Sequence, residues 1–350
     1  MEPKNIVGGV SKVAYYLSRE LAKKINITVF PSFKATFGYF EKILKIYGDF
    51  VAGRFEIVHF NIVPTWINGG YALLELARTK SIGTILNIHG IIPLEHKLEP
   101  SLGRIPRMGL IYTLRACKLV DKIVVNSKYM KDLVVNWYNI RPEKIVVIPN
   151  GVDFEKFNKC ETRVALPGDP AILYVGRFSM RKGLDILFQA VKEVRSELPK
   201  LKLHLIGWGD QELFRRLAKK LEIENLVVFH GWLEEQELPA YYKSADFCVF
   251  PSKHEPFGLV FLEAMASGCP IIVTPVGIIP EIIIHGENGL IVEPNNPDFL
   301  AKAILMLAQD VSLRKKLSQN TIETVKKYTW DRISVLYIVL YKELLEEKLR

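Results

Sequence analysis

Short apolar runs of strand length recur along the chain, with stretches of helical periodicity between them. Their hydrophobicity is continuous rather than alternating, which indicates strands that are covered on both faces of a sheet. One polar stretch, residues 158–170, interrupts the rhythm. The predicted strands cover residues 25–30, 55–60, 84–88, 122–126 and 144–149 before this stretch, and 171–175, 202–206, 226–230, 246–250, 270–274 and 289–293 after it.

Strands that alternate with helices form parallel β-α-β units, so the pattern predicts two doubly wound α/β domains. A length of 350 residues agrees with two domains. We predict an N-terminal domain over residues 1–160, a C-terminal domain over residues 161–328 and a final helix over residues 329–350 that packs back toward the N-terminal domain. Ligands of such sheets bind beyond the carboxyl ends of the strands, so functional residues are expected in the segments that follow each strand.

Both ends of the chain show the periodicity of an amphipathic helix. Residues 11–24 carry an apolar stripe of Val13, Leu17 and Leu21, and Ser11 is a candidate N-cap. The last helix, near residues 330–349, is expected to bury one side. That side carries Ile333, Leu336, Leu340, Leu344 and Leu345.

The front of the chain is short for a doubly wound domain. Such a domain opens with a strand that leads into a glycine-rich turn, yet Gly8-Gly9-Val10 follows Met1 with no room for a strand of about five residues. Either this domain lacks its first strand, or the true start lies upstream and Met1 is an internal methionine. The second possibility is favoured.

The composition is that of a folded globular protein. Its 49% hydrophobic and 24% charged residues exclude wholesale disorder, collagen-like repeats and coiled coils. The longest apolar run, Ile333–Tyr341, is too short to cross a bilayer, and the N-terminus shows no secretory signal, so a cytoplasmic location is expected.

The cysteines lack metal-ligand or redox spacing and are expected to be buried apolar side chains. They are Cys117, Cys160, Cys248 and Cys269.

The net charge of +9 comes entirely from the first half of the chain. Residues 1–160 contain 23 Lys and Arg against 13 Asp and Glu, whereas residues 161–350 contain 24 against 25. The basic residues are dispersed along helices, which favours a solvated surface. A face that meets nucleic acid or an anionic membrane is the alternative interpretation.

Two loops after strands of the second half carry candidate chemistry. After strand 171–175, residues 176–183 include Arg177, Arg181 and Lys182 just before a helix, which favours an anion site suited to a diphosphate. A solvated basic loop would have the same composition.

The second such loop follows strand 246–250. Pro256 and Gly258 shape a turn before a helix near residues 260–267. The backbone N–H groups near Gly258 and Leu259 are then expected to lack partners within the helix and to point into the crevice. Glu255 precedes the turn, and Glu263 lies about one helical turn inside. Either carboxylate could also be an ordinary surface residue.

These residues carry a family resemblance. The string HEPFGLVFLEAMASGCPIIVTPVG separates Glu255 from Glu263 by seven residues and resembles the E-x7-E signature of the GT-B retaining glycosyltransferases of family 4. The resemblance implies two Rossmann-like domains that face each other across a cleft. Relative to that fold, this sequence is short by the first strand of the N-terminal domain. Further matching motifs follow in the same order along the whole chain. They are Gly8-Gly9-Val10, Asn87-Ile88-His89-Gly90, Val125-Asn126-Ser127, Ile148-Pro149-Asn150-Gly151-Val152-Asp153, Val175-Gly176-Arg177 with Lys182-Gly183, Gly207-Trp208-Gly209, and Pro280-Glu281 with Gly286 and Gly289.

The resemblance implies site residues in the C-terminal domain, which holds most of the nucleoside-diphosphate sugar. Arg177 and Lys182 match the pair that binds the diphosphate, and Glu263 matches the carboxylate that binds the ribose hydroxyls. Glu255 matches the catalytic carboxylate beside the donor sugar, where an anion stabilises an oxocarbenium-like transition state. Backbone amides complete the set: Phe257 and Gly258 for the donor sugar and Leu259 for the diphosphate.

The N-terminal domain contributes two residues to the site that the resemblance implies. Gly9 matches the glycine whose backbone approaches the donor diphosphate, which requires a residue without Cβ. His89 matches the catalytic histidine next to the donor sugar. By itself a lone histidine after a strand is more often structural, and its place in the ordered motifs reverses that expectation.

The reaction that the resemblance implies is transfer of a sugar to an acceptor hydroxyl with retention at the anomeric carbon. No D-x-D motif occurs, which fits a transferase without a metal site, and no cofactor is expected because the nucleotide sugar is a substrate. The acceptor is a glycan, a lipid or a small molecule.

Other functions remain open at the level of sequence. A nucleotide-sugar epimerase or a phosphorylase would use the same fold. A basic protein that binds nucleic acid or anionic lipid without transferase activity belongs to a different class, and the chain lacks a recognised nucleic-acid module, so no nucleic-acid partner is expected. Peripheral attachment to the inner face of a membrane, near a lipid acceptor, is a further expectation. It depends on basic residues of the 11–24 helix and on Arg104, Arg107, Arg115 and Lys118.

Overall fold

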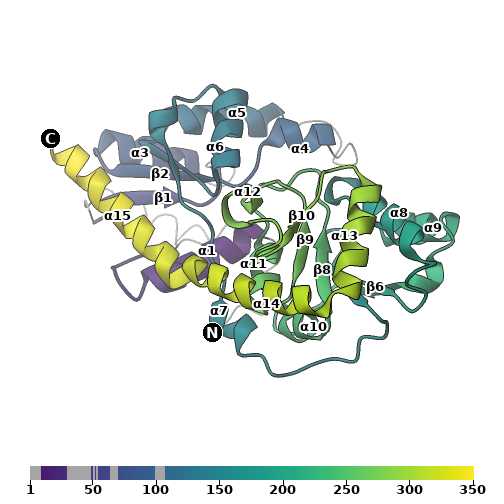
Figure 1. The fold of residues 1–350 in the computed structure, drawn as a ribbon. Helices are drawn as coiled ribbons and strands as arrows, with labels where there is room; N and C mark the ends of the chain where they lie inside the picture. The colour runs from purple at the N-terminus through teal and green to yellow at the C-terminus, as the bar shows by residue number, and fades with distance from the viewer. Residues whose placement is uncertain (1–8, 30–48, 50–51, 53, 64–69, 99–106) are drawn as a thin grey trace, which may run out of the picture. The chain divides into compact units, whose positions relative to one another are not determined.

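The computed structural model describes residues 9–29, 49, 52, 54–63, 70–98 and 107–350 (Figure 1). The chain forms two compact units. Unit 1 comprises Met1–Asn150 with Trp330–Arg350, and unit 2 comprises Gly151–Thr329. The units therefore divide at residue 150, rather than at the 160 expected from the sequence, because Phe157 is buried against Tyr242 in the core of unit 2.

Unit 1 contains a parallel sheet of four strands in the order β1-β2-β3-β4. Four predicted strands of the first half are present. They are β1 (Ile57–Phe60), β2 (Gly83–Ile88), β3 (Lys122–Val125) and β4 (Ile145–Val147). Leu86, Ile88 and Ile123 are buried against helices that follow in sequence, as continuous apolar strands require.

The strand predicted at residues 25–30 is wrong over its described part. Residues 25–29 are not a strand, and residue 30 lies outside the described residues. Asn26, Thr28 and Val29 are exposed, and within the described part of the chain no strand pairs with this segment. An apolar run becomes a strand only where a neighbour accepts its backbone hydrogen bonds. The missing first strand concerns the residues before Gly9, which lie outside the described residues.

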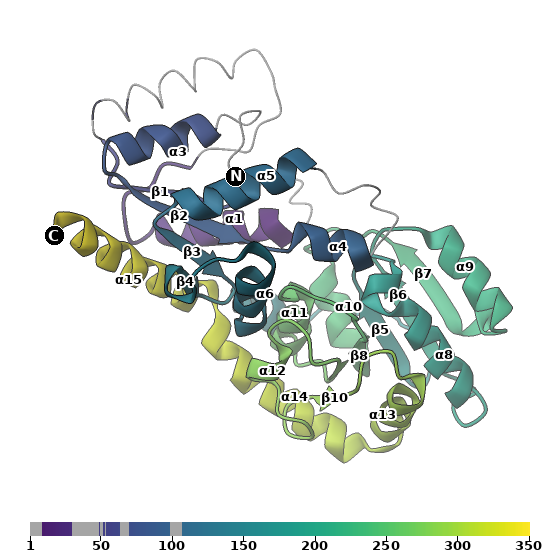
Figure 2. The same cartoon turned by 90° about the horizontal axis from the view of Figure 1, so that it is seen from above.

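The helices of unit 1 flank this sheet (Figures 1 and 2). They are α1 (Gly9–Leu21), α3 (Gly70–Thr79), α4 (Ile92–Leu98), α5 (Arg107–Leu119), α6 (Lys128–Tyr138), the 3-10 turn η2 (Pro142–Lys144) and α15 (Trp330–Leu349). The α1 stripe of Val13, Leu17 and Leu21 is buried as predicted, although the helix begins at Gly9 rather than Ser11. Its Tyr16 ring stacks on Trp330 of α15, with 6.0 Å between the ring centroids.

The buried face of α15 differs from the predicted one at Leu336, and the predicted Leu345 is only partly buried. Ile333, Leu340 and Leu344 are buried, but Leu336 is 45% exposed and Tyr337 is buried instead. At about 100° per residue, Tyr337 lies at the centre of the buried stripe and Leu336 at its edge. The predicted stripe selected Leu336, the neighbour of Tyr337, and so missed the residue at its centre.

Unit 2 contains a parallel sheet of six strands in the order β10-β9-β8-β5-β6-β7. All six predicted strands of the second half are present. They are β5 (Ala171–Val175), β6 (Lys202–Ile206), β7 (Val227–Gly231), β8 (Phe247–Phe250), β9 (Ile271–Val273) and β10 (Leu290–Ile291). The helical elements are α7 (Phe154–Asn158), η3 (Met180–Lys182), α8 (Leu184–Val194), α9 (Gln211–Lys220), η4 (Glu224–Leu226), α10 (Leu238–Ser244), α11 (Leu259–Ala266), α12 (Ile279–Ile282), α13 (Pro297–Gln309), α14 (Val311–Val325) and η5 (Lys326–Tyr328).

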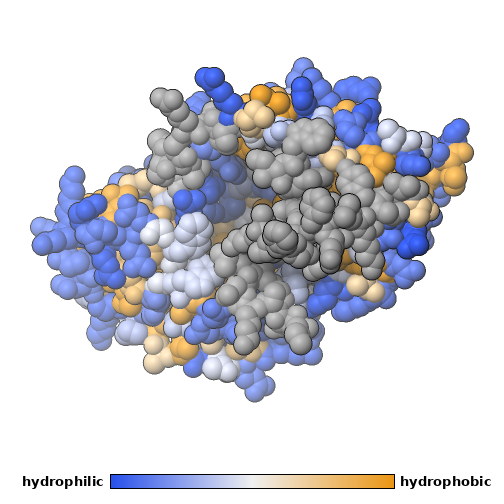
Figure 3. All heavy atoms as spheres, turned by 180° about the vertical axis from the view of Figure 1, so that it is seen from behind, coloured by the Kyte–Doolittle hydropathy of each residue, from blue (hydrophilic) through white to orange (hydrophobic). Residues whose placement is uncertain are grey.

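Both faces of the unit 2 sheet are covered by helices. Ile172 and Tyr174 of β5 pack with α8, α9 and α13, of which α8 and α13 lie side by side (Figure 2). Leu173 and Val175 point to the opposite face and pack with α10 and α11. The outer surface around α9 is mainly hydrophilic in Figure 3. Its exposed residues are Glu212, Arg215, Arg216, Lys219 and Lys220.

Cys117, Cys248 and Cys269 are buried, as predicted, whereas Cys160 is partly exposed; all four are free thiols. Cys248 and Cys269, which are 21 residues apart, lie on neighbouring segments with their sulfur atoms 3.3 Å apart. Burial raises the pKa of the Cys248 thiol well above its usual value.

Among the described residues, no helix combines the length and apolarity that a membrane span needs.

Candidate functional site

The carboxyl ends of β5 and β8 bring two loops of unit 2 into contact. The loop after β5 turns through η3 and ends at Gly183, whose φ of +71° favours glycine. A Cβ there would lie 1.9 Å from the carbonyl oxygen of Pro251, in the loop after β8. The backbone amide of Lys253 also donates to the carbonyl of Arg181 at 2.9 Å. Gly183 is therefore the residue that permits the loop after β5 to approach the loop after β8.

Lys182 and Glu255 form a direct ion pair within this contact. Their side chains are only 14% and 11% exposed. Burial alone would raise the pKa of Glu255, but the charge and hydrogen bond of Lys182, together with Arg181, hold it below its usual value of 4.5. The carboxylate is thus kept ionised by its cationic neighbours.

Other polar contacts fix the same two loops. Lys253 binds Asp185 of α8 at 2.7 Å, and Arg181 donates to the carbonyl of His254 at 3.3 Å. The guanidinium of Arg177 lies over the ring of Trp208, 4.7 Å from its centroid. The loop between β5 and α8 thus carries three cations, Arg177, Arg181 and Lys182, of which Lys182 pairs with Glu255.

Glu263 lies on α11, which begins at Leu259 after the turn at Gly258. A Cβ at Gly258 would lie 2.2 Å from the ring of Phe261, and its φ is +95°, so this turn also requires glycine. Glu263 is buried and its Oε2 accepts a hydrogen bond from the hydroxyl of Tyr242 at 3.3 Å. Burial, and then the nearby Glu263, raise the pKa of Tyr242 well above its usual value. Tyr242 thus stays a donor that orients the carboxylate.

Phe257 is 3% exposed, and its side chain belongs to the core of unit 2. The sugar contact predicted from the sequence is one of its backbone amide. A Cβ at Gly277 would lie 2.7 Å from the carbonyl oxygen of Phe257, so the 275–278 loop is closely packed on this segment.

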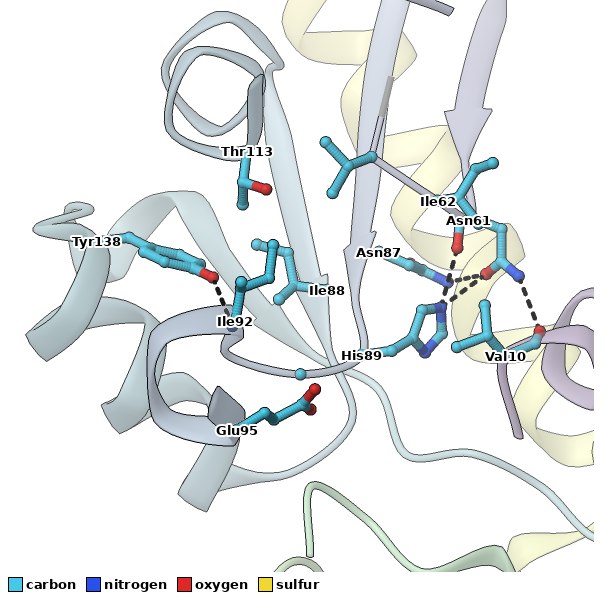
Figure 4. A pocket seen from close by; sticks show the side chains of 12 residues that line it. Val10, Asn61, Ile62, Asn87, Ile88, His89, Ile92, Glu95, Thr113 and Tyr138 are labelled. Carbon is cyan, nitrogen blue, oxygen red and sulfur yellow. Dashed lines mark hydrogen bonds between the residues drawn. The ribbon is translucent and has the colours of Figure 1, made fainter. Parts of the chain in front are cut away.

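Unit 1 contains a separate pocket of about 270 Å³ (Figure 4). It includes His89, directly after β2, and Val10, the neighbour of Gly9 at the start of α1. The full lining is Val10, Asn61, Ile62, Val63, Asn87, Ile88, His89, Gly90, Ile92, Glu95, Thr113 and Tyr138. The structure thus places the two unit 1 residues predicted for the site at, or next to, one hollow.

His89 is held in this pocket by Asn61, a residue that the sequence pattern did not single out. Its Nε2 lies 3.1 Å from the carbonyl oxygen and 3.2 Å from the side-chain oxygen of Asn61. The amide of Asn61 also donates to the carbonyl of Val10 at 3.4 Å. Burial lowers the pKa of His89 from 6.5 to about 4, so the ring is neutral near pH 7. Asn61 follows β1, and the rule that functional residues follow parallel strands could have found it.

The predicted residues thus fall into two groups. Arg177, Lys182, Glu255, Phe257, Gly258, Leu259 and Glu263 belong to unit 2, and Gly9 and His89 to unit 1. In the described ranges, no group of three or more His, Cys, Asp or Glu side chains is arranged to hold a metal ion.

Comparison with family models gives two matches. The model described as glycosyl transferases group 1 matches residues 160–324, and the model described as glycosyltransferase family 4 matches residues 25–156.

Curated relatives are similar over about two thirds of the chain. An uncharacterized glycosyltransferase of Methanocaldococcus jannaschii is 34% identical over 251 residues, which cover 68% of this chain and 63% of the relative. A D-inositol 3-phosphate glycosyltransferase of Streptomyces bingchenggensis is 30% identical over 240 residues, which cover 64% of this chain and 53% of the relative. The matched part therefore spans less than two thirds of the length of these relatives.

Solved structures show the same fold over nearly the whole chain. Sucrose-phosphate synthase from Thermosynechococcus elongatus has a TM-score of 0.76 at 24% identity and covers 97% of this chain and 94% of its own. The HepE protein of Anabaena, solved with UDP and glucose, has a TM-score of 0.71 at 18% identity and covers 98% of both chains. Both units thus have the architecture of the GT-B fold.

Proposed function

Since the chain belongs to the group 1 glycosyltransferases of family 4, we propose that it transfers a sugar from a nucleoside-diphosphate sugar to an acceptor hydroxyl. In this proposal the anomeric configuration is retained and no metal ion takes part. The sugar that is transferred is a hexose, and the acceptor is a glycan, a lipid or a small molecule.

The observation that carries the proposal is the contact between two loops of unit 2 in which Lys182 pairs with Glu255. Arg177 and Lys182 lie at the carboxyl end of β5, where ligands of parallel sheets bind. As the glycosidic bond breaks, negative charge grows on the departing diphosphate, and fixed cations lower the energy of that state. Positive charge grows on the sugar, which the ionised Glu255 beside them stabilises.

In this proposal Glu263 binds the ribose of the donor nucleoside. Two adjacent ribose hydroxyls are donors, and a carboxylate accepts both. The hydroxyl of Tyr242 fixes the orientation of this carboxylate at 3.3 Å. The same resemblance assigns Gly9 and His89, in unit 1, to the donor phosphates and the donor sugar.

The test is a transfer assay with the full chain. UDP-, GDP- and ADP-sugars are incubated with candidate acceptor alcohols, UDP-sugars first because the HepE structures contain UDP. We expect release of the nucleoside diphosphate, a glycoside with the donor's anomeric configuration, and the same rate in EDTA. Isomerisation of the donor without acceptor would indicate an epimerase, and dependence on inorganic phosphate a phosphorylase. Activity that EDTA abolishes and Mn²⁺ restores would contradict metal independence.

A peripheral attachment to membranes is a second part of the proposal, carried by the exposed face of α5. This face joins cations to apolar side chains, as in helices that lie on a lipid surface. It comprises Arg107, Met108, Ile111, Arg115 and Lys118, of which Met108 is 58% and Ile111 43% exposed. Arg104, also predicted for this role, lies outside the described residues.

The expected result for this helix concerns vesicle binding. The full chain should float with vesicles that contain anionic phospholipid, and the double change Arg115→Glu/Lys118→Glu should reduce the bound fraction at least about tenfold, since each basic residue near such a surface contributes about 1 kcal/mol. The matched control is Arg215→Glu/Lys219→Glu on the exposed face of α9. Equal flotation with neutral and anionic vesicles would refute the attachment.

A further inference from the structure

A continuous run of hydrogen bonds joins His89 to the C-terminal helix α15. From His89 it passes through Asn61 to Asn87, whose amide donates to the side-chain oxygen of Asn61 at 2.8 Å (Figure 4). The side-chain oxygen of Asn87 lies 2.9 Å from Nε2 of His59, and Nδ1 of His59 lies 2.7 Å from the hydroxyl of Tyr341. Residues from β1, β2 and α15 thus meet in one polar chain inside unit 1.

The acceptors around His89 determine where its proton lies. Nε2 faces two oxygen atoms of Asn61, a carbonyl and an amide oxygen, and neither can donate. Nε2 must therefore carry the hydrogen. In a neutral imidazole the other nitrogen then has a lone pair, and in Figure 4 this nitrogen points away from Asn61.

The rest of the run fixes the orientation of both asparagines. The amide nitrogen of Asn87 faces the side-chain oxygen of Asn61 and the hydroxyl of Tyr337, 3.2 Å away. The oxygen of Asn87 then faces Nε2 of His59, so this nitrogen carries the hydrogen and Nδ1 accepts the hydrogen of Tyr341. If Asn61 were turned over, its amide nitrogen would meet the amide nitrogen of Asn87. Only one assignment of donors and acceptors satisfies the whole run.

Partial burial helps to keep these donors and acceptors in their assigned roles. His59 is half-buried, desolvation lowers its pKa to about 4, and its ring stacks on Tyr337 with the centroids 5.3 Å apart. Burial also raises the pKa values of Tyr337 and Tyr341, so both hydroxyls keep their hydrogens. Each group in a partly buried polar network must keep its partner, because a polar group that loses its partner away from water destabilises the fold.

We propose that Asn61 and Asn87 are positioning residues that hold His89 as the Nε2–H tautomer, with Nδ1 as a hydrogen-bond acceptor for a substrate hydroxyl. Tyr341 of α15 sets the far end of the run. The role of the accepting nitrogen depends on the proposed function, whereas the tautomer does not. His89 then acts by accepting a hydroxyl hydrogen bond that orients the donor or acceptor sugar, and it does not donate a proton.

The test is nitrogen NMR of the full chain labelled with ¹⁵N-histidine, with the His89 ring assigned by loss of its signals in His89→Gln. Without substrate, near neutral pH, we expect Nε2 of His89 in the protonated range and Nδ1 in the unprotonated range. Asn61→Asp should keep this pattern, because a carboxylate oxygen accepts the same two bonds. Asn61→Ala keeps the backbone carbonyl as the one remaining acceptor of Nε2, so it should shift both nitrogens only part of the way toward the average of the two tautomers. A His89 ring with its proton on Nδ1 overturns the inference.

Two further readouts separate positioning from mere stability. Asn61→Ala should lower kcat for transfer about tenfold while KM for the nucleotide sugar changes little, and Asn61→Asp should restore most of the rate. Tyr341→Phe, which keeps the ring, should move the Nδ1 signal of His59. An unchanged His59 spectrum in Tyr341→Phe would overturn the part assigned to α15. Absence of any sugar transfer in the wild type would instead refute the proposed function and leave the tautomer result standing.

Discussion

Lys182→Met should lower the rate of sugar transfer by about 10²- to 10³-fold, the usual effect of removing one fixed group that stabilises charge in a transition state. Methionine keeps most of the length of the side chain and removes its charge and its hydrogen-bond donors. The lost cation is the one that lies closest to Glu255, between the sugar and the diphosphate in our proposal. Initial rates with saturating donor and acceptor measure the effect on kcat.

The matched control for this prediction is Lys192→Met. Lys192 is an exposed cation on α8, the helix that follows Lys182, and it has no place in the proposed site. Its replacement should leave the rate unchanged. A Lys182→Met chain that works as fast as Lys192→Met would contradict the assignment of the diphosphate site.

The same replacement should also cost stability, because Lys182 and Glu255 form a largely buried pair. Removal of one partner leaves the other as an uncompensated buried charge, and such changes destabilise proteins by about 3 kcal/mol or more. Arg181 also faces Glu255 and reduces this loss. The free energy of unfolding in urea near neutral pH should therefore fall by about 3 kcal/mol, within the ~5–15 kcal/mol that keeps a domain folded.

A double variant and a stability measurement at acid pH distinguish loss of the ion pair from other causes of destabilisation. Lys182→Met/Glu255→Gln contains no unpaired charge, so it should be more stable than Lys182→Met alone. The pKa of Glu255 lies below its usual 4.5, so the stabilisation is present above about pH 4.5 and is lost as the pH falls through the lowered value. The wild type and Lys182→Met should thus converge in acid. A double variant no more stable than the single one would show that the pair contributes nothing.

Most strands could be predicted from the sequence because their apolar runs are continuous. Strands such as β5 are buried on both faces, so a short and fully apolar run like that of residues 171–175 indicates a strand inside a covered sheet. Residues 25–29 show why such a pattern is not sufficient. Ile25 and Ile27 alternate with exposed Asn26 and Thr28, and a strand also needs a neighbour, which the local sequence does not contain.

The candidate site was predictable in composition but not in pairing. The loops with Arg177, Lys182 and Glu255 could be found because each follows a strand of a parallel sheet. The ion pair could not, because it depends on Gly183 allowing close approach to Pro251, 68 residues further along the chain. Asn61 was missed for a similar reason: its contact with His89 becomes visible only when β1 and β2 lie side by side.

The central claim is that unit 2 holds a nucleoside diphosphate on its β5–α8 loop, and the most direct measurement is calorimetric titration of UDP, GDP and ADP into the full chain. We predict that at least one of them binds, that Lys182→Met weakens this binding at least about tenfold through loss of a charge-assisted contact, and that Lys192→Met leaves it unchanged. Binding of equal strength in Lys182→Met, or no binding of any of the three to the wild type, would contradict the account.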